Sequence, residues 1–314
     1  MEATIDRLHR AQESAVSGYL RIPEGLRDMA LAAFFFSLMS LLVKLVGQRL
    51  PASEVVMARS VVSLAISWVM LRRVGIVPWG RRKGLLTVRG LVGFVALLCF
   101  FYAIPRLPLA DVTTIQFTNP AFTALFAAVF IRERMTRTVV FSIALSLAGV
   151  TLIAQPTLLF GSGADALDLT AVGIALLGAV FAALAYTTVR KLRETEHALV
   201  VVFYFPLVSI PACLPIMAPV AVWPTAAEWL MLIGIGVLTQ IAQIFLTNGL
   251  HKEKAGRATS VSYLQILFAA LWGFLFFGEI PDGLTVLGVV LVISGVVYVA
   301  RASNQAARSG ASIS

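Results

Sequence analysis

An isolated arginine, Arg59, interrupts an apolar stretch of the chain and offers the clearest binding chemistry in the sequence. If that stretch crosses a membrane, an ionised side chain there costs several kcal/mol or more and should face protein or a watery cavity. Its planar guanidinium can hold a carboxylate or phosphate group through two parallel hydrogen bonds. Alternatively, Arg59 has a structural role and either caps helix-end carbonyls or pairs with Glu54. Glu54 lies five residues before it, whereas helical side chains meet when they are three or four residues apart.

Two further kinds of side chain could contact a solute. Lys44 lies near the end of the preceding apolar stretch, where it could bind an anion or extend its charge to the external headgroups. Tyr102, Tyr186 and Tyr263 could stack on a ring-bearing solute, although such residues are more often packing or interfacial anchors. Each of these residues is a candidate for the binding site.

Amide side chains recur at helical spacing in other apolar stretches. Residues three or four apart share one face of a helix. Such amides could line a cavity and exchange hydrogen bonds with a solute, or they could bond neighbouring helices at about 1 kcal/mol or less each. The candidates are the pairs Gln116 with Asn119 and Gln240 with Gln243, and the single Gln265.

The sequence contains no recognisable set of catalytic, metal-binding or cofactor-binding residues. Cys99 and Cys213 both lie in apolar stretches and are interpreted as small hydrophobic side chains. The turn at 161–163 has two glycines but lacks the lysine and threonine of a nucleotide-binding loop. We therefore expect a protein that is not an enzyme and that needs neither a metal ion nor a cofactor.

The composition indicates a membrane protein. Of the 314 residues, 59% are hydrophobic and 13% are charged, whereas a soluble protein carries about 25% charged residues. The net charge of +9 would raise nucleic acid as a partner of a soluble chain. Here the basic residues cluster between apolar runs, as they do on the cytoplasmic side of membrane proteins, so we expect no nucleic-acid binding.

Ten apolar segments approach the length of about 20 residues that a membrane-spanning helix needs. With the N-terminus in the cytoplasm, most of the 25 lysine and arginine residues fall on the cytoplasmic side, Arg89 among them. We therefore expect an all-α, polytopic protein of the cell membrane with both termini in the cytoplasm. The seventh segment contains four prolines between Pro206 and Pro219 and should be kinked or broken. The expected segments are 28–48, 54–72, 87–105, 109–131, 137–155, 169–190, 198–218, 228–250, 257–278 and 283–301.

The two halves of the sequence match when one is shifted by 146 residues. Lys44 then falls on Arg190, and Glu133 falls on Glu279. One period covers five helices, and because five is odd the halves must cross the membrane in opposite orientations, as the inverted repeats of secondary transporters do. The expected organisation is a cytoplasmic tail at 1–27, a first repeat at 28–155, an external linker at 156–168, a second repeat at 169–301 and a cytoplasmic tail at 302–314.

Motifs in both halves resemble those of one transporter family. They lie at 101–111, 119–122 and 131–136 in the first half, and at 256–258, 277–279 and 287–296 in the second. Together with Lys44 and Arg59, they resemble the EamA-type drug/metabolite transporter superfamily over nearly the whole chain. The resemblance implies ten helices in two inverted repeats around a central cavity. One departure is Gln265, which stands where the first half has Asn119 before a proline, so the proline break of the fourth helix should have no counterpart in the ninth.

The expected function is a secondary active or facilitative transporter of a small organic metabolite, either an amino acid or an organic anion, that works by alternating access. The resemblance implies export as the commoner direction. A carrier of a flavin, a nucleoside or a drug-like cation on the same fold is the alternative, and a membrane channel or scaffold protein is the alternative from another class. The expected partners are a small-molecule solute and the lipid bilayer, while a homodimer and the coupling ion stay open.

Overall fold

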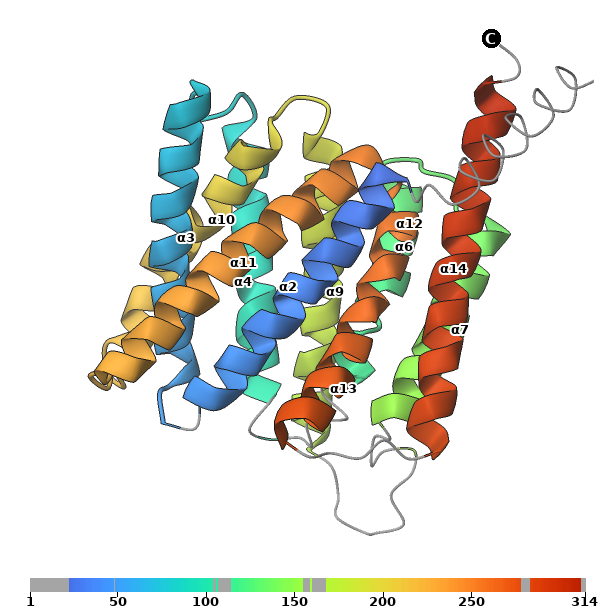
Figure 1. The fold of residues 1–314 in the computed structure, drawn as a ribbon. Helices are drawn as coiled ribbons and strands as arrows, with labels where there is room; N and C mark the ends of the chain where they lie inside the picture. The colour runs from blue at the N-terminus through green and yellow to red at the C-terminus, as the bar shows by residue number, and fades with distance from the viewer. Residues whose placement is uncertain are drawn as a thin grey trace, which may run out of the picture.

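A computed structural model describes residues 23–47, 49–103, 106, 114–154, 159, 168–277 and 283–311. Every regular element in these ranges is a helix, and the helices run side by side in one bundle (Figure 1). Eight of the described helical segments are long and apolar enough to cross a membrane. The chain is therefore a polytopic, all-helical membrane protein.

Apart from α6, which begins ten residues after the start of its expected segment, the helices begin close to the expected positions, and three of them start at capping side chains, His197 of α10 among them. Asp168 accepts hydrogen bonds from Thr170 N and Ala171 N, and Thr225 caps the first turn of a later helix. The last helix continues to Ala311, beyond the expected boundary at 301. The helices are α2 (Glu24–Val46), α3 (Ala52–Val74), α4 (Lys83–Ala103), α6 (Asn119–Phe130), α7 (Arg137–Ala154), α9 (Leu169–Leu192), α10 (Ala198–Met217), α11 (Ala226–Lys252), α12 (Ala255–Ser260), the 3₁₀ helix η1 (Val261–Tyr263), α13 (Leu264–Phe277) and α14 (Gly283–Ala311).

Helices break at equivalent places in the two halves. α6 begins at Asn119 with Pro120 in its first turn, a position that suits proline because no hydrogen bond from its nitrogen is needed there. The ninth expected segment is interrupted as well, since η1 separates α12 from α13. The expectation that the proline break of the fourth helix has no counterpart in the ninth is therefore wrong, because a 3₁₀ turn can interrupt a helix without a proline. Phe117 and Tyr263, which correspond under the 146-residue shift, stack with their ring centroids 5.8 Å apart.

The proline-rich segment is continuous. α10 contains Pro206, Pro211 and Pro215 inside one uninterrupted helix, so of the expected kink or break, the break does not occur. Proline is tolerated within membrane helices where neighbouring groups satisfy the freed backbone carbonyls. Most residues in the first half of α10 are buried, which places this helix inside the bundle.

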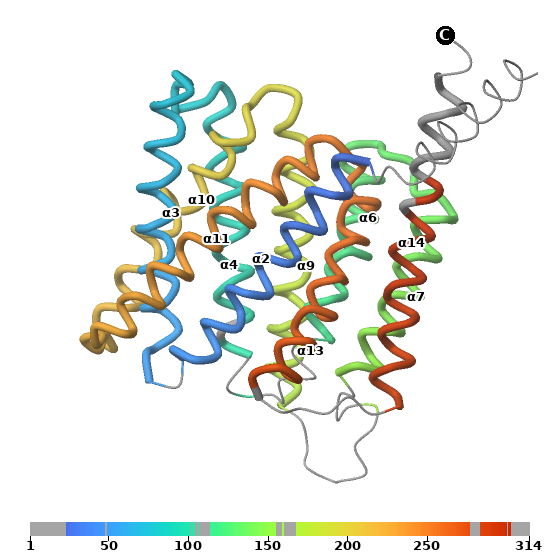
Figure 2. Tube along the Cα trace, in the orientation of Figure 1, coloured from blue at the N-terminus to red at the C-terminus, as the bar shows by residue number. Residues whose placement is uncertain are grey.

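Small residues join α7 to α14, which lie side by side at one edge of the bundle (Figure 2). A Cβ atom added to Gly149 would lie 2.6 Å from the carbonyl oxygen of Gly288, so both glycines are needed for the close approach. A second contact joins Ser142 to Gly295, where the serine hydroxyl donates a 2.7 Å hydrogen bond to the glycine carbonyl. Under the 146-residue shift, Ser142 corresponds to Gly288 and Gly149 corresponds to Gly295. The Ser142–Gly295 contact and the Gly149–Gly288 contact are therefore equivalent in the two halves.

The same shift relates two contacts that α3, α4, α10 and α11 make with one another. Gly90 of α4 packs against the side chain of Val208 in α10, and Gly236 of α11 packs against Val62 in α3. The shift carries Gly90 to Gly236 and Val62 to Val208. The similarity between the halves therefore extends from residue types to the contacts between helices.

Candidate functional site

Arg59 lies about two turns into α3 and is 9% exposed. Its guanidinium carbon lies 5.5 Å from the centroid of the Phe205 ring on α10. The residues that the structure describes include no carboxylate that forms an ion pair with it. Arg59 therefore brings a positive charge into the protein interior with an aromatic ring, rather than an acid, as its neighbour.

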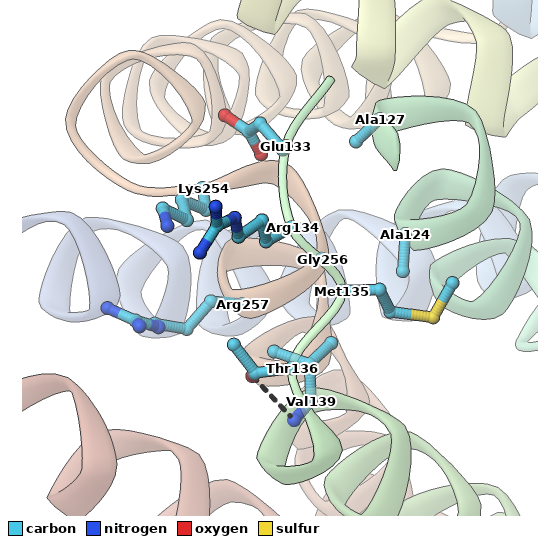
Figure 3. Close-up of a pocket in the computed structure, with 10 residues that line it drawn as sticks. All are labelled: Ala124, Ala127, Glu133, Arg134, Met135, Thr136, Val139, Lys254, Gly256 and Arg257. Atoms are coloured by element: carbon cyan, nitrogen blue, oxygen red, sulfur yellow. Dashed lines mark hydrogen bonds between the residues drawn. The ribbon is translucent and has the colours of Figure 1, made fainter. Parts of the chain in front are cut away.

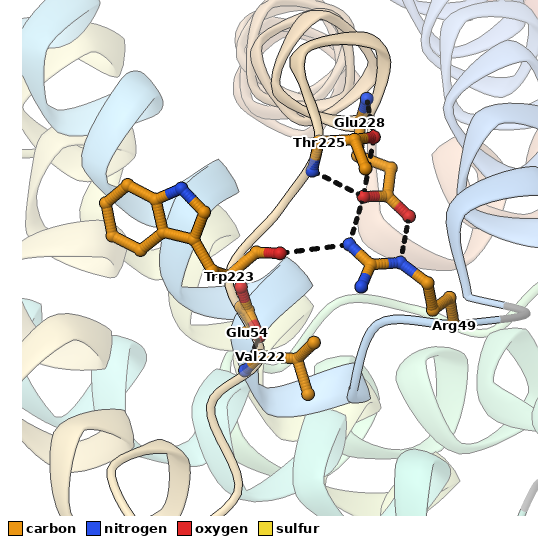
Figure 4. Close-up of polar contacts among 6 residues, drawn as sticks. All are labelled: Arg49, Glu54, Val222, Trp223, Thr225 and Glu228. Carbon is orange, nitrogen blue, oxygen red and sulfur yellow. Dashed lines mark hydrogen bonds and ion pairs between the residues drawn. The ribbon is translucent and has the colours of Figure 1, made fainter.

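Glu54, the partner considered for Arg59, is engaged elsewhere (Figure 4). It is 8% exposed, and its Oε2 accepts a 2.9 Å hydrogen bond from the backbone nitrogen of Val222. Nearby, Arg49 donates to Glu228 through its Nε at 2.7 Å and to the carbonyl of Trp223 at 3.0 Å. These two acids thus hold the loop between α10 and α11 in place.

A second buried arginine, Arg89, lies beside the same ring. It is 3% exposed, and its guanidinium carbon is 4.8 Å from the Phe205 centroid. Its Nη2 donates a 3.2 Å hydrogen bond to Gln243 Oε1 on α11, while Nε and Nη1 are buried without a hydrogen-bond partner. Arg89 was assigned to the cytoplasmic side from charge alone, and its burial was not foreseen; α4 begins at Lys83, which leaves Arg89 almost two turns inside the helix. A predicted helix start near Lys83, in place of residue 87, would have placed Arg89 well inside the helix.

Three of the other predicted residues lie around these arginines or in the adjoining helix contact. Tyr186 of α9 is half-buried and packs against the core cluster that contains Tyr204 of α10, and Gln243 accepts the hydrogen bond described above. Gln240 is 1% exposed and donates from Nε2 to Ser67 Oγ at 2.8 Å, so it bonds α11 to α3. Gln240 and Gln243 therefore have different partners, and Gln243 is the one that contacts an arginine, Arg89.

A second group of predicted residues lies at the helix breaks of α6 and η1. Tyr263 is fully buried and its hydroxyl has no hydrogen-bond partner, and the same is true of the buried Asn119 Oδ1. Gln116 and Gln265 lie close to these breaks and are half-buried. Among the described residues, no hydrogen bond or ion pair links these four to Arg59 or Arg89.

Lys44 and Tyr102 lie apart from both groups. Lys44 is exposed in the last turn of α2. Tyr102 is 37% exposed and carries the guanidinium carbon of Arg106 3.8 Å above its ring. It also contributes to a cavity of about 430 Å³ with mostly apolar walls. The lining residues are Ser53, Val56, Leu98, Cys99, Tyr102, Ile174, Cys213 and Ile216.

A buried ion pair joins the two halves at one end of the bundle. Arg190 of α9 is 6% exposed, and its Nε donates to Glu133 Oε1 at 2.7 Å. Its Nη1 donates to the carbonyls of Leu250 and His251 at 3.1 and 2.8 Å, and Glu133 Oε2 accepts from the nitrogen of Ala255 at 2.9 Å. Glu133 therefore holds the segment after α6 against α9 and α12. The corresponding Glu279 and the turn at 161–163 lie outside the described residues.

The surface around Glu133 is strongly basic (Figure 3). Arg134, Lys254 and Arg257 line a small pocket with it, between the segment after α6 and the start of α12. These basic residues are among those from which the cytoplasmic side was predicted, so the orientation of the bundle stays a prediction.

The sequence profile of the EamA-like transporter family matches this chain twice, over residues 28–155 and again over 169–301. The chain belongs to the EamA-like transporter family. The two matched regions coincide with the two expected repeats, and nearly all described helices fall within them. As a member of this family, the chain is an integral membrane transporter of the cell membrane whose partners are a small-molecule solute and lipid.

Named relatives of this EamA-like protein occur in bacteria and animals. The pseudopaline exporter CntI of Pseudomonas aeruginosa is 35% identical over 281 residues, which cover 89% of this chain and 97% of that protein. Human solute carrier family 35 member G1 is 31% identical over 282 residues, covering 86% of this chain and 77% of that protein. A crystal structure with 19% sequence identity superposes with a TM-score of 0.76 over 87% of this chain and 95% of its own, which shows that the two share a fold.

Proposed function

We propose that this protein is a secondary or facilitative carrier that exports a small organic solute bearing a carboxylate group. The proposal rests on Arg59, a buried guanidinium beside Phe205 with no acidic partner among the described residues. A buried charge without a counter-ion is costly, so it is retained where it performs a function. A carboxylate that enters from solution can form two charge-assisted hydrogen bonds with it.

The proposed mechanism is alternating access by ten helices in two inverted five-helix repeats, with both termini in the cytoplasm. The recurrence of the Gly90 and Gly149 contacts under the 146-residue shift supports the repeat. Arg59 belongs to the first half and Phe205 to the second, and the shift carries one position to the other. A solute bound between them would contact both halves, which is where inverted-repeat carriers hold their substrate.

Export is the direction that we propose, supported by the similarity to an exporter of Pseudomonas aeruginosa. A carrier of drug-like cations is disfavoured by the positive charge of Arg59. A close ion pair between Arg59 and Glu54 would have reopened that alternative, but the carboxylate of Glu54 accepts from Val222 N instead.

Counterflow in proteoliposomes tests this function. Vesicles containing the wild type, Arg59→Met or Arg72→Met are preloaded with unlabelled amino acids or mono-, di- and tricarboxylates, and uptake of the labelled solutes is measured. We expect saturable exchange of a carboxylate-bearing solute that falls about 100-fold or more in Arg59→Met, because a hydrogen-bonded charge pair contributes about 1.5–3 kcal/mol and two such bonds are lost. Arg72 is the matched control because it also stacks on a ring, that of Trp68 at 4.7 Å, but is exposed.

Three outcomes would contradict the proposal. Flux that rises linearly with solute concentration would indicate a channel. No exchange of any solute in the panel would rule out the proposed solute class. Exchange that survives Arg59→Met would show that Arg59 does not bind the solute.

A further inference from the structure

Two arginines from different helices share one aromatic ring inside the protein. The guanidinium carbons of Arg59 on α3 and Arg89 on α4 lie 5.5 and 4.8 Å from the centroid of Phe205 on α10. Both side chains are more than nine-tenths buried, and their like charges repel each other. The ring offers each cation a favourable face but cannot neutralise it.

The described part of the chain leaves these charges uncompensated. Arg89 has five N–H donors in a planar fork, and the structure pairs Nη2 with Gln243 while Nε and Nη1 are buried without partners. No described carboxylate forms an ion pair with either arginine. A guanidinium does not lose its proton in a protein, and the described residues supply no acid to neutralise it, so a bound anion is the counter-ion that this part of the chain calls for.

We propose that Arg59 and Arg89 together bind a solute that carries two carboxylate groups. This proposal rests on the proposed function and specifies the substrate class of the same site. Each planar guanidinium matches one planar carboxylate through two parallel hydrogen bonds, so two forks on separate helices suit two carboxylates better than one compact ion. The Gln243 amide adjoins Arg89 and supplies a further polar group for the second carboxylate.

The two halves contribute differently to this site. Both arginines come from the first half, and the equivalent positions in the second half are Phe205 and Ile235, which are apolar. The solute therefore places its carboxylates toward α3 and α4 and its carbon skeleton toward the Phe205 ring. This asymmetry gives the solute one orientation between the two halves.

The first test needs no ligand and measures the Tm of purified protein in detergent. Replacing a buried charge that lacks a counter-ion by an apolar side chain of similar length is commonly neutral or stabilising, whereas removing one partner of a buried ion pair is strongly destabilising. We expect Arg59→Met and Arg89→Met to have a Tm equal to or above that of the wild type, and the control Arg72→Met to match the wild type. A large fall in Tm in both arginine variants would overturn the proposal and make the two arginines structural.

The second test compares dicarboxylates with matched monocarboxylates. Succinate and glutarate are added to the wild type, Arg59→Met, Arg89→Met and Arg72→Met, beside butyrate, valerate and inorganic phosphate, and the ligand-induced rise in Tm is recorded and then checked by counterflow. We expect a dicarboxylate to raise the Tm of the wild type more than its monocarboxylate match or phosphate. Apparent affinity should fall about tenfold or more when either arginine is removed.

Each remaining result overturns the inference in a recognisable way. Monocarboxylates that bind or exchange as well as dicarboxylates would reject the two-carboxylate site while leaving the proposed carrier intact. A larger rise in Tm with phosphate than with the dicarboxylates would show that the site binds a compact dianion. Absence of any dicarboxylate effect on Tm rejects the inference whatever the counterflow panel shows, whereas the carrier proposal is decided by the counterflow panel.

Discussion

Arg190→Met is expected to destabilise the protein by about 3–5 kcal/mol, the usual cost of removing one partner from a buried ion pair. The substitution leaves Glu133, which is 16% exposed, without its cationic partner. It also removes the hydrogen bonds to the carbonyls of Leu250 and His251 at the end of α11. We expect a markedly lower Tm in detergent and loss of counterflow, because this pair joins the segment after α6 to α9 and α11.

A double-mutant cycle separates the ion pair from its surroundings. Glu133→Gln keeps an acceptor for Ala255 N but removes the charge, so Glu133→Gln combined with Arg190→Met should be less destabilised than the sum of the two single variants. Lys191→Met is the matched control, since Lys191 is 40% exposed and pairs with an equally exposed Glu194. Additive effects in the cycle would contradict a direct Arg190–Glu133 interaction of this strength.

Gly149→Leu is expected to separate α7 from α14. A Cβ atom at this position lies 2.6 Å from the carbonyl oxygen of Gly288 and 3.0 Å from the backbone nitrogen of Val292. Because the obstacles are backbone atoms, a change of rotamer cannot relieve the clash and one helix has to move. Overpacking of this kind costs about 1–3 kcal/mol or more, which should appear as a lower Tm and a lower yield of monodisperse protein.

The control for this prediction is Gly173→Leu in α9. A Cβ atom at Gly173 meets nothing within 4 Å, and the residue is exposed. The Tm of this variant should stay close to that of the wild type. Equal Tm values for Gly149→Leu and Gly173→Leu would show that the α7–α14 contact is looser than its geometry indicates.

The helical membrane architecture could be predicted from the sequence because it depends on local composition. A bilayer demands long apolar helices, and charged or turn-forming residues between them mark their ends. Most predicted boundaries lie within a few residues of those observed, as for the segment 137–155 and the helix Arg137–Ala154. Family membership was also accessible, since the motifs on which the resemblance rests are short runs of sequence.

The break in the ninth segment was missed because its cause is not a residue type. Pro120 indicates in the sequence that a helix begins at α6. η1 contains no proline, and its Tyr263 stacks on Phe117 from the other half. Conversely, α10 stays helical through three prolines, of which Pro206 is buried and Pro211 and Pro215 are exposed. The residue type alone therefore does not decide whether a helix of this bundle continues.

The sequence by itself determined that this is an all-helical membrane protein with two similar halves, and that Arg59 is an unusual charge within it. Only the tertiary structure decided which groups face Arg59. Glu54 is near in sequence but accepts from Val222, while Arg89 and Phe205 are distant in sequence and lie beside Arg59. The physical reason is that helical periodicity fixes which face a residue occupies, whereas the angle and depth at which helices pack fix what that face meets.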